Sequence, residues 1–312
     1  MPSRTPGRND DLPIGRFLPF PPGQGNVLVP TAPRRAAALG CTLYTASKPI
    51  PIALQTVLWS VLRVGGQRLL PGQRVTWDPP VSVPTMRRLW AAWTTVAGDH
   101  LDGLAVYNRP QSSRPGIAVL LSSRRRSTLV RLRRDPNQLT QEISISQAAE
   151  RLSTRSFRVP RVLDVGSVDD WHWSAFELMT SRPHRPARTA SAALTEEVSA
   201  LVESVVTRRL DTPRHWTGSH GDLTPWNLRK AGRSSNPPWL IDWEDAEWAP
   251  PGLDQVYFAA SSSAIFPRRR VDPAPLRRYA EAAAQAASAI RARPDDDPDL
   301  TAAMLATLDS IR

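Results

Sequence analysis

The order of the elements predicted for residues 101–180 constrains the fold most strongly. Three short runs rich in Val, Ile, Leu and Tyr are separated by polar turns: LAVYNRP, IAVLLSS and STLVRLRR. Such runs are typical of β-strands, and the short turns predict an antiparallel meander. A helical segment, 138–152, follows, and the strand-like runs RVPRVLDVGSVDD and WHWSAFELM complete the unit. We therefore predict a small antiparallel sheet that a helix interrupts once, after its third strand.

The residues after 180 have a different pattern. Apolar residues recur there at helical spacing in four segments, 191–210, 254–266, 275–293 and 299–312. Strands that cluster in one half of a chain and helices that cluster in the other predict an α+β architecture. We expect a sheet-containing N-terminal lobe and a mainly helical C-terminal lobe.

The chain divides into four predicted regions. Residues 1–26 are rich in Pro, Gly, Arg and Asp, which predicts a disordered tail. Residues 27–100 contain two helical patterns but no motif, so we treat them as an extension of unassigned role. Residues 101–180 form the predicted small lobe, and residues 181–312 form the helical large lobe.

Composition limits the possible locations and partners. The 312 residues suffice for two lobes with separate cores, and 41% hydrophobic and 22% charged residues are ordinary for a globular protein. No run of about 18 apolar residues is present, so we predict no membrane-spanning helix. The single cysteine, Cys41, cannot form an internal disulfide, which favours the cytoplasm.

The formal net charge of +11 is compatible with an anionic binding partner. The arginines are scattered, and the clusters RRRSTLVRLRR and PRRR are not interleaved with aromatic residues. Proteins that bind single-stranded nucleic acid combine a positively charged groove with stacking aromatic side chains. Nucleic acid is therefore not the favoured partner.

The stretch HGDLTPWN, 220–227, followed by LIDW, 240–243, carries the clearest chemistry. Phosphoryl transfer needs a carboxylate to orient the attacking hydroxyl and oxygen ligands to hold Mg²⁺ against phosphates. A turn places Asp222 and Asn227 on one side, and a strand can bring Asp242 to face them. Taken singly, Asp222 could cap a helix and Asn227 could make a turn. The combination of all three favours a phosphoryl-transfer site.

The pattern HxDxxxxN followed by a hydrophobic strand with Asp resembles the catalytic and metal loops of the protein-kinase-like fold. The forms HGD, DLTPWN and IDWE resemble the aminoglycoside phosphotransferase and choline kinase branch in particular. The resemblance implies Asp222 as catalytic base, Asn227 and Asp242 as Mg²⁺ ligands, and His220 as a structural residue. It also implies that Asp254, within PPGLDQVYF, ties a helix of the large lobe to the catalytic loop.

The small lobe resembles this family in topology, with one departure. In the family, the third strand carries a Lys that contacts the nucleotide phosphates and the helix carries a Glu that pairs with it. Here Arg131 in STLVRLRR takes the Lys position, and Glu142 takes the Glu position. Arginine is a planar fork and lysine a compact point charge, so the phosphate contact cannot be identical. An outward-facing strand residue is the alternative for Arg131.

The remaining nucleotide contacts are assigned by the same resemblance. No GxGxxG motif is present, so the turn PQSSRPG, with Ser112 and Ser113, would cover the phosphates. The stretch FELM, 176–179, resembles the hinge that holds the adenine, which assigns Phe176 and Leu178 to the nucleotide site. The expected cofactors are ATP, or another nucleoside triphosphate, and Mg²⁺.

Three functions follow from these observations. The first is an ATP- and Mg²⁺-dependent phosphotransferase that acts on a hydroxyl group of a small molecule. The second is a kinase-shaped binding protein that has weak or no turnover because it lacks the third-strand Lys. The third, supported only by the arginine excess, is a binder of anions or nucleic acid.

Overall fold

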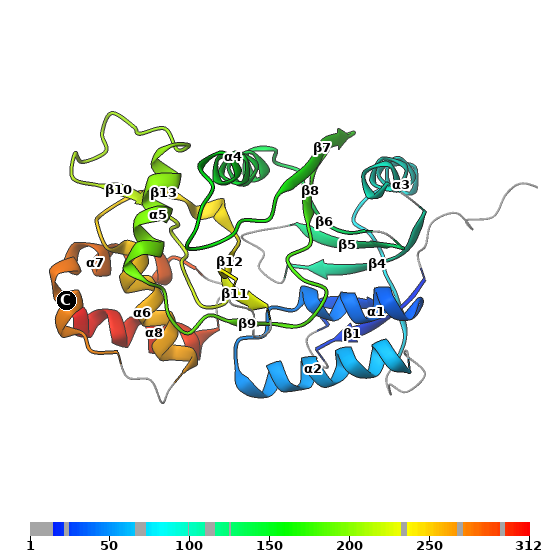
Figure 1. Ribbon diagram of the computed structural model, residues 1–312, viewed down its shortest axis with the longest axis horizontal. Helices are drawn as coiled ribbons and strands as arrows, with labels where there is room; N and C mark the ends of the chain where they lie inside the picture. The colour runs from blue at the N-terminus through cyan, green and yellow to red at the C-terminus, as the bar shows by residue number, and fades with distance from the viewer. Residues whose placement is uncertain are drawn as a thin grey trace, which may run out of the picture.

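The computed structural model describes residues 15–21, 25–65, 73–98, 100–109, 116–124, 126–231, 236–266, 271–293 and 297–312. Two lobes lie side by side (Figure 1). The N-terminal lobe is built on an eight-stranded antiparallel sheet in the order β3-β1-β2-β4-β5-β6-β8-β7, and the C-terminal lobe is mainly helical. Within the described residues, no helix combines the length and apolar character that crossing a membrane requires.

The five strands predicted for the small lobe form five of the eight strands of this sheet. They are β4 (Leu101–Asn108), β5 (Ile117–Ser123), β6 (Ser127–Arg133), β7 (Val162–Val168) and β8 (Trp171–Glu177). The predicted helix between the third and fourth is α4 (Asn137–Leu152). Because β8 pairs with both β6 and β7, the strand that leads into the predicted hinge lies inside the sheet.

The segment before residue 101 extends the same sheet. Its strands are β1 (Arg16–Phe20), β2 (Val27–Pro30) and β3 (Val75–Thr76). The strand β2 pairs with β4, with Val27 opposite Tyr107, and β1 pairs with β2. Residues 16–20 lie within the segment predicted as a disordered tail, and in the structure they are a paired strand.

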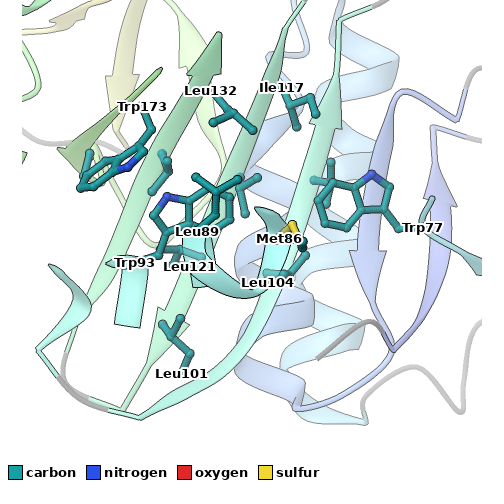
Figure 2. Packing of buried hydrophobic residues seen from close by; sticks show 14 of the residues in the cluster. Trp77, Met86, Leu89, Trp93, Leu101, Leu104, Ile117, Leu121, Leu132 and Trp173 are labelled. Carbon is teal, nitrogen blue, oxygen red and sulfur yellow. The ribbon is translucent and has the colours of Figure 1, made fainter. Parts of the chain in front are cut away.

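Helices of the same segment cover both faces of the sheet. They are α1 (Arg34–Gly40), the short 3₁₀ helix η1 (Cys41–Leu43), α2 (Pro49–Val64) and α3 (Val83–Ala97). On one face, Trp93 and Leu89 of α3 pack against the core residues of β4, β5, β6 and β8 (Figure 2). On the opposite face, Leu39 of α1 packs against Ala105 and Leu120. Burying both faces of the sheet explains why residues 27–100 fold together with the small lobe.

The described residues of the C-terminal lobe form four α-helices and several short strands. The helices are α5 (Ala192–Glu203), α6 (Leu253–Ile265), α7 (Ala280–Arg291), preceded by the 3₁₀ helix η4 (Ala274–Tyr279), and α8 (Pro298–Ile311). The strands are β9 (His184–Pro186), β10 (Thr217–Ser219), β11 (Leu228–Ala231), β12 (Trp239–Leu240) and β13 (Glu247–Ala249). Pairing of β10 with β13, and of β11 with β9 and β12, frames the loops that carry the predicted site.

The predicted helix over 191–210 is too long. The structure ends α5 at Glu203, where the Ser204 hydroxyl donates to the carbonyl oxygen of Leu201 at 2.7 Å. The next residues, Val205 and Val206, are β-branched and disfavour continuation of a helix. The early end leaves room for the turns that lead into β10.

Polar contacts join the N-terminal extension to the helical lobe. Arg229, fully buried on β11, donates through Nε to Nδ1 of His184 at 2.7 Å and through Nη2 to the carbonyl oxygen of Ala46 at 3.0 Å. Nε2 of His184 lies 3.2 Å from the carbonyl oxygen of Thr42. Because its Nδ1 accepts a hydrogen bond, His184 is neutral, and Nε2 donates to Thr42. Burial lowers the pKa of His184 to about 3 and that of Arg229 to about 9.

We predict that the buried, neutral His184 makes the stability of the fold sensitive to acid. In the unfolded chain His184 takes up a proton below about pH 6.5, whereas in the folded protein it does so only near pH 3. Unfolding therefore takes up a proton in that window, and its free energy falls by about 1.4 kcal/mol per pH unit as the pH drops. Above pH 6.5 the effect vanishes. Urea denaturation from pH 7.5 to 4.5 measures the slope, and His184→Asn should flatten it by about one proton; equal slopes would contradict the prediction.

Candidate active site

The loop between β10 and β11 is anchored from behind by α6. Asp254, in the first turn of α6, accepts the Ser219 hydroxyl through Oδ1 at 2.8 Å and the His220 backbone N–H through Oδ2 at 2.9 Å. All three residues are buried. Burial raises the pKa of Asp254, and these hydrogen bonds oppose that rise. Asp254 thus fixes the entrance of the loop and acts on the site only through other residues.

His220 links this loop to the segment that carries Asp242. Its Nδ1 accepts the backbone N–H of Asp222 at 3.3 Å, and its Nε2 lies 3.1 Å from the carbonyl oxygen of Ile241. An Nδ1 that accepts carries no proton, so Nε2 is the donor and the ring is neutral. Burial lowers the pKa of His220, in agreement with this tautomer. Its ring also lies 4.5 Å from that of Trp243, between ring centroids. These contacts of His220 hold the loop and the Asp242 segment together, as expected of a structural residue.

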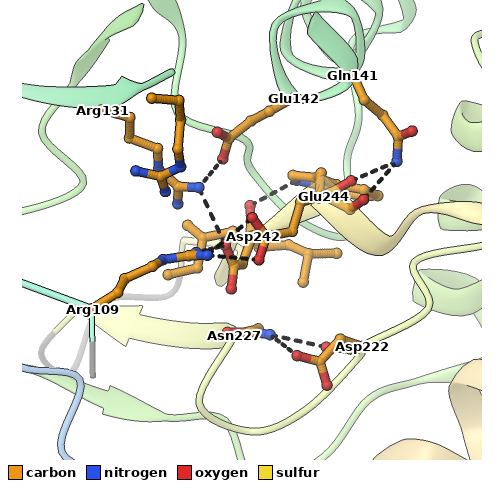
Figure 3. A network of polar contacts seen from close by, with 12 residues as sticks. Arg109, Arg131, Gln141, Glu142, Asp222, Asn227, Asp242 and Glu244 are labelled. Carbon is orange, nitrogen blue, oxygen red and sulfur yellow. Dashed lines mark hydrogen bonds and ion pairs between the residues drawn. The ribbon is translucent and has the colours of Figure 1, made fainter. Parts of the chain in front are cut away.

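Asp222 and Asn227 face one another across the loop (Figure 3). The Asn227 amide nitrogen donates to Oδ2 of Asp222 at 3.1 Å and to its backbone oxygen at 3.0 Å. A guanidinium nitrogen of Arg293, just after α7, lies 3.5 Å from Oδ1 of Asp222. The nearby guanidinium and the donated hydrogen bond both favour the ionised carboxylate. An ionised Asp222 that faces a cavity can take a proton from a hydroxyl group.

Gly221 shapes the turn between His220 and Asp222. Its φ is +77°, and a Cβ there would lie 2.1 Å from the backbone oxygen of Asp245. We expect Gly221→Ala to lower the unfolding free energy by about 2 kcal/mol or more, because strain and a backbone clash add. Gly98→Ala is the matched control, since Gly98 has φ +67° with no atom near the added Cβ. Equal losses for the two variants in urea denaturation would contradict the clash.

Asp242 lies between β12 and the 3₁₀ helix η3 (Trp243–Asp245). Its φ of +71° is a left-handed conformation, which Asp tolerates better than most residues. Helix α4 holds this segment, because Nε2 of Gln141 donates to the backbone oxygens of Trp243 at 2.9 Å and Ala246 at 2.8 Å. No local pattern in the sequence marks Gln141 for this role.

Arg131 reaches from the sheet to both carboxylates that face it. Its Nη1 lies 2.8 Å from Oε1 of Glu142 on α4 and 3.2 Å from Oδ1 of Asp242 (Figure 3). Burial disfavours the cation, but Glu142 and Asp242 together raise the pKa of Arg131 above its ordinary value. Arg131 therefore points into the crevice between the lobes and not toward solvent, and one nitrogen makes both contacts, as an ammonium would.

A cavity of about 420 Å³ joins these groups. Asp222, Asn227, Asp242 and Arg131 all line it, and so does Leu178 of the predicted hinge. Phe176, also assigned to the nucleotide site, is buried in the sheet and is absent from the described lining. Ser112 and Ser113 lie outside the described residues. The extension adds a wall that the sequence did not predict, formed by Thr42, Leu43 and Thr45.

The donor set fits Mg²⁺ bound together with phosphates. Among the described His, Cys, Asp and Glu residues, no group of three is placed to hold a metal. Asn227 and Asp242 nevertheless line one cavity, and the bonds that Asn227 makes through its nitrogen leave its oxygen as the ligand atom. Mg²⁺ is commonly held by one or two carboxylates with phosphate oxygens and water. These residues thus suit a cation that arrives with a nucleotide.

Two arginines of the site were missed from the sequence. Arg109, directly after β4, bonds to Asp242 and Glu244, and Arg293 bonds to Asp222 and Asp245. Their partners are remote in sequence, so no local spacing marks them. The one available signal was the place of Arg109 between a strand and the turn expected to cover the phosphates.

A known protein family matches most of the helical lobe. A family model described as APH, phosphotransferase enzyme family, matches residues 196–295. This range holds the loop predicted to be catalytic, the segment with Asp242 and the helices α6 and α7. No match to the chain is found among curated protein sequences. The resemblance predicted from HGDLTPWN and LIDW is confirmed by this match.

Several solved structures are similar to this chain at low sequence identity. Aminoglycoside phosphotransferase APH(4)-Ia is 11% identical with a TM-score of 0.50, covering 74% of this chain and 98% of that chain. Spectinomycin phosphotransferase APH(9)-Ia, in complex with ADP and spectinomycin, is 9% identical with a TM-score of 0.43, covering 75% and 94%. The microcompartment-associated aminopropanol kinase is 12% identical with a TM-score of 0.41, covering 72% and 95%. The likeness to APH(4)-Ia confirms the predicted two-lobed protein-kinase-like fold.

Proposed function

We propose that this protein transfers the terminal phosphoryl group of ATP, or of another nucleoside triphosphate, to a hydroxyl group of a small molecule. The observation that carries the proposal is the convergence on one cavity of the Asp222–Asn227 pair and of Asp242 with Arg131. The match to a phosphotransferase family over residues 196–295 supports the same chemistry. A nucleotide complex of a structural neighbour, APH(9)-Ia with ADP, is in keeping with the expected cofactor.

Each group has a defined part in the transfer. Asp222 orients the acceptor hydroxyl and takes its proton as the hydroxyl oxygen bonds to the γ-phosphorus. The bond from the γ-phosphorus to the bridging oxygen breaks, and the nucleoside diphosphate leaves. Arg131 contacts the phosphates, and Asn227 holds the Asp222 carboxylate in place. Bound Mg²⁺, held by Asn227 and Asp242, would neutralise charge on the phosphates.

The acceptor is proposed to lie on the Asp222 side of the cavity. The lining there comes from the catalytic loop and from α7 and α8, and it is largely apolar: Trp226, Ile290, Leu300 and Met304. Arg293 and Thr301 add polar groups to the same wall. An acceptor that carries an apolar part beside its hydroxyl group fits this composition best.

Two measurements test the proposal. Thermal unfolding with ADP, with and without Mg²⁺, should show a rise in Tm that is larger with the metal. Release of ADP from ATP should then be measured with a panel of hydroxyl-bearing small molecules, and at least one should raise the rate above that without acceptor. The absence of both a nucleotide-dependent Tm shift and acceptor-dependent release would contradict the proposal.

The kinase-shaped binding protein is the alternative that the same assays separate. It predicts a nucleotide-dependent rise in Tm together with no ADP release for any acceptor. The position of Arg131 speaks for turnover, because the arginine keeps contacts to Glu142 and Asp242 within 3.2 Å. A solvent-facing Arg131 would have favoured the alternative.

A further inference from the structure

Arg109 bridges the two lobes at the carboxylate proposed to bind the metal. Its Nη2 lies 3.0 Å from Oδ1 of Asp242, and its Nη1 lies 2.8 and 3.1 Å from the two carboxylate oxygens of Glu244 (Figure 3). The side chains are largely buried, with 12% of Arg109, 21% of Asp242 and 13% of Glu244 exposed. The fork of one guanidinium therefore spans two carboxylates of the helical lobe.

Oδ1 of Asp242 accepts from two arginines at once. Arg131 lies 3.2 Å from the same oxygen that Arg109 contacts. Cations that share one carboxylate repel one another, so a further cation at Asp242 is disfavoured while both guanidinium groups stay there. Nucleotide phosphates change this balance, because they offer the guanidinium groups other anionic partners.

Arginine density around the cavity favours such an anion. Arg133, buried on β6, lines the cavity with Arg109 and Arg131. Its Nη1 donates to the backbone oxygens of Leu132 and Ile117, and within the described part of the chain no ion pair joins Arg133 to a carboxylate. Planar guanidinium groups match phosphate oxygens in bidentate geometry. Among the described residues, the arginines that line the cavity therefore carry more positive charge than the carboxylates pair with directly.

We propose that Arg109 is a phosphate-binding residue that exchanges partners. Without nucleotide it holds Asp242 and Glu244 and competes there with a divalent cation; with nucleotide it moves to the phosphate oxygens and leaves Asp242 to the metal. This inference rests on the proposed function, since it presumes a nucleoside polyphosphate in the cavity. By linkage, nucleotide then strengthens metal binding and metal strengthens nucleotide binding.

Arg109→Gln tests this exchange through two binding measurements that need no turnover. One is ADP binding in EDTA by calorimetry, and the other is Mn²⁺ binding without nucleotide, followed by electron paramagnetic resonance. We expect the variant to bind metal-free ADP about tenfold more weakly and Mn²⁺ alone about tenfold more tightly, since one charged contact is lost and one competitor is removed. Arg88→Gln, which breaks a more exposed pair with Asp169, is the matched control and should change neither.

The opposite signs separate partner exchange from a structural role. A merely structural Arg109 would weaken both ligands, and an irrelevant one would leave both unchanged; either result overturns the inference. So would a wild-type protein that binds ADP with Mg²⁺ but not in EDTA. If no nucleotide binds under any condition, the proposed function itself fails.

Glu244→Gln gives a second test should Arg109→Gln lower the Tm strongly. This change removes one carboxylate that holds Arg109, so the guanidinium is released to phosphates and to Asp242. Metal-free ADP should then bind more tightly and Mn²⁺ alone more weakly, the reverse of Arg109→Gln. If Glu244→Gln and Arg109→Gln changed the affinities for ADP and for Mn²⁺ in the same direction, the inference would be overturned.

Discussion

Asp222→Asn is expected to lower kcat by about a thousandfold and to leave nucleotide affinity within a few fold. A positioned general base contributes between a hundredfold and ten-thousandfold to a transfer of this kind. An amide cannot take the acceptor's proton, yet it keeps the shape of the carboxylate. The effect should fall on kcat because, in the proposed mechanism, the carboxylate acts on the hydroxyl group while Arg131 and the metal ligands hold the phosphates.

Steady-state ADP release with saturating nucleotide and acceptor measures this loss. Asp211→Asn is the matched control, because Asp211 is exposed in the turn after α5, ahead of the proposed catalytic loop. Calorimetry with ADP and Mg²⁺ checks that the variant still binds nucleotide. A kcat within tenfold of the wild-type value would contradict the role of Asp222 as base and would leave the fold unaffected.

Local spacing explains why the loop proposed to be catalytic stands out in the sequence. The residues proposed to act together, from His220 to Asn227, lie within one loop, so their pattern is visible in eight consecutive residues. The same holds for β4, β5 and β6, whose runs are long enough to show strand composition. Features whose geometry is set within a few residues are visible before any tertiary contact is known.

Long-range contacts explain what the sequence could not predict. Arg109 is separated from Asp242 by 133 positions and from Glu244 by 135, and Gln141 from Trp243 by 102. Such pairings leave no periodicity. The helices of the extension were recognisable, but their packing on both faces of the sheet follows from burial of the whole sheet and not from a local pattern.

Short strands were missed for a different reason. The strands β1, β2 and β3 have 5, 4 and 2 residues, and both RFLPF and VLVP contain proline. Proline removes a ladder donor and normally argues against a strand, except at an edge or an end. Composition therefore favoured a tail for residues 16–20, whereas in the structure their pairing with β2 and β3 decides their conformation.

Arg131→Met is expected to cost about 3 kcal/mol or more of unfolding free energy and to weaken nucleotide binding by about tenfold to a hundredfold. Only 12% of the Arg131 side chain and 7% of the Glu142 side chain are exposed. Removing the cation leaves a buried carboxylate without its ion-pair partner, which typically costs 3 to 5 kcal/mol in total. Loss of a charged hydrogen bond to phosphate accounts for the weaker nucleotide binding.

A double variant separates the two roles of Arg131. In Arg131→Met with Glu142→Gln the buried charge is gone, so urea denaturation should return to within about 1 kcal/mol of the wild type. Nucleotide affinity should stay low, because no cation is restored at the phosphates. Arg131→Lys should lose less affinity than Arg131→Met, since one nitrogen of Arg131 makes both carboxylate contacts. Recovery of ADP affinity in the double variant would mean that Arg131 serves stability alone, and the third-strand residue would then have no part in nucleotide binding.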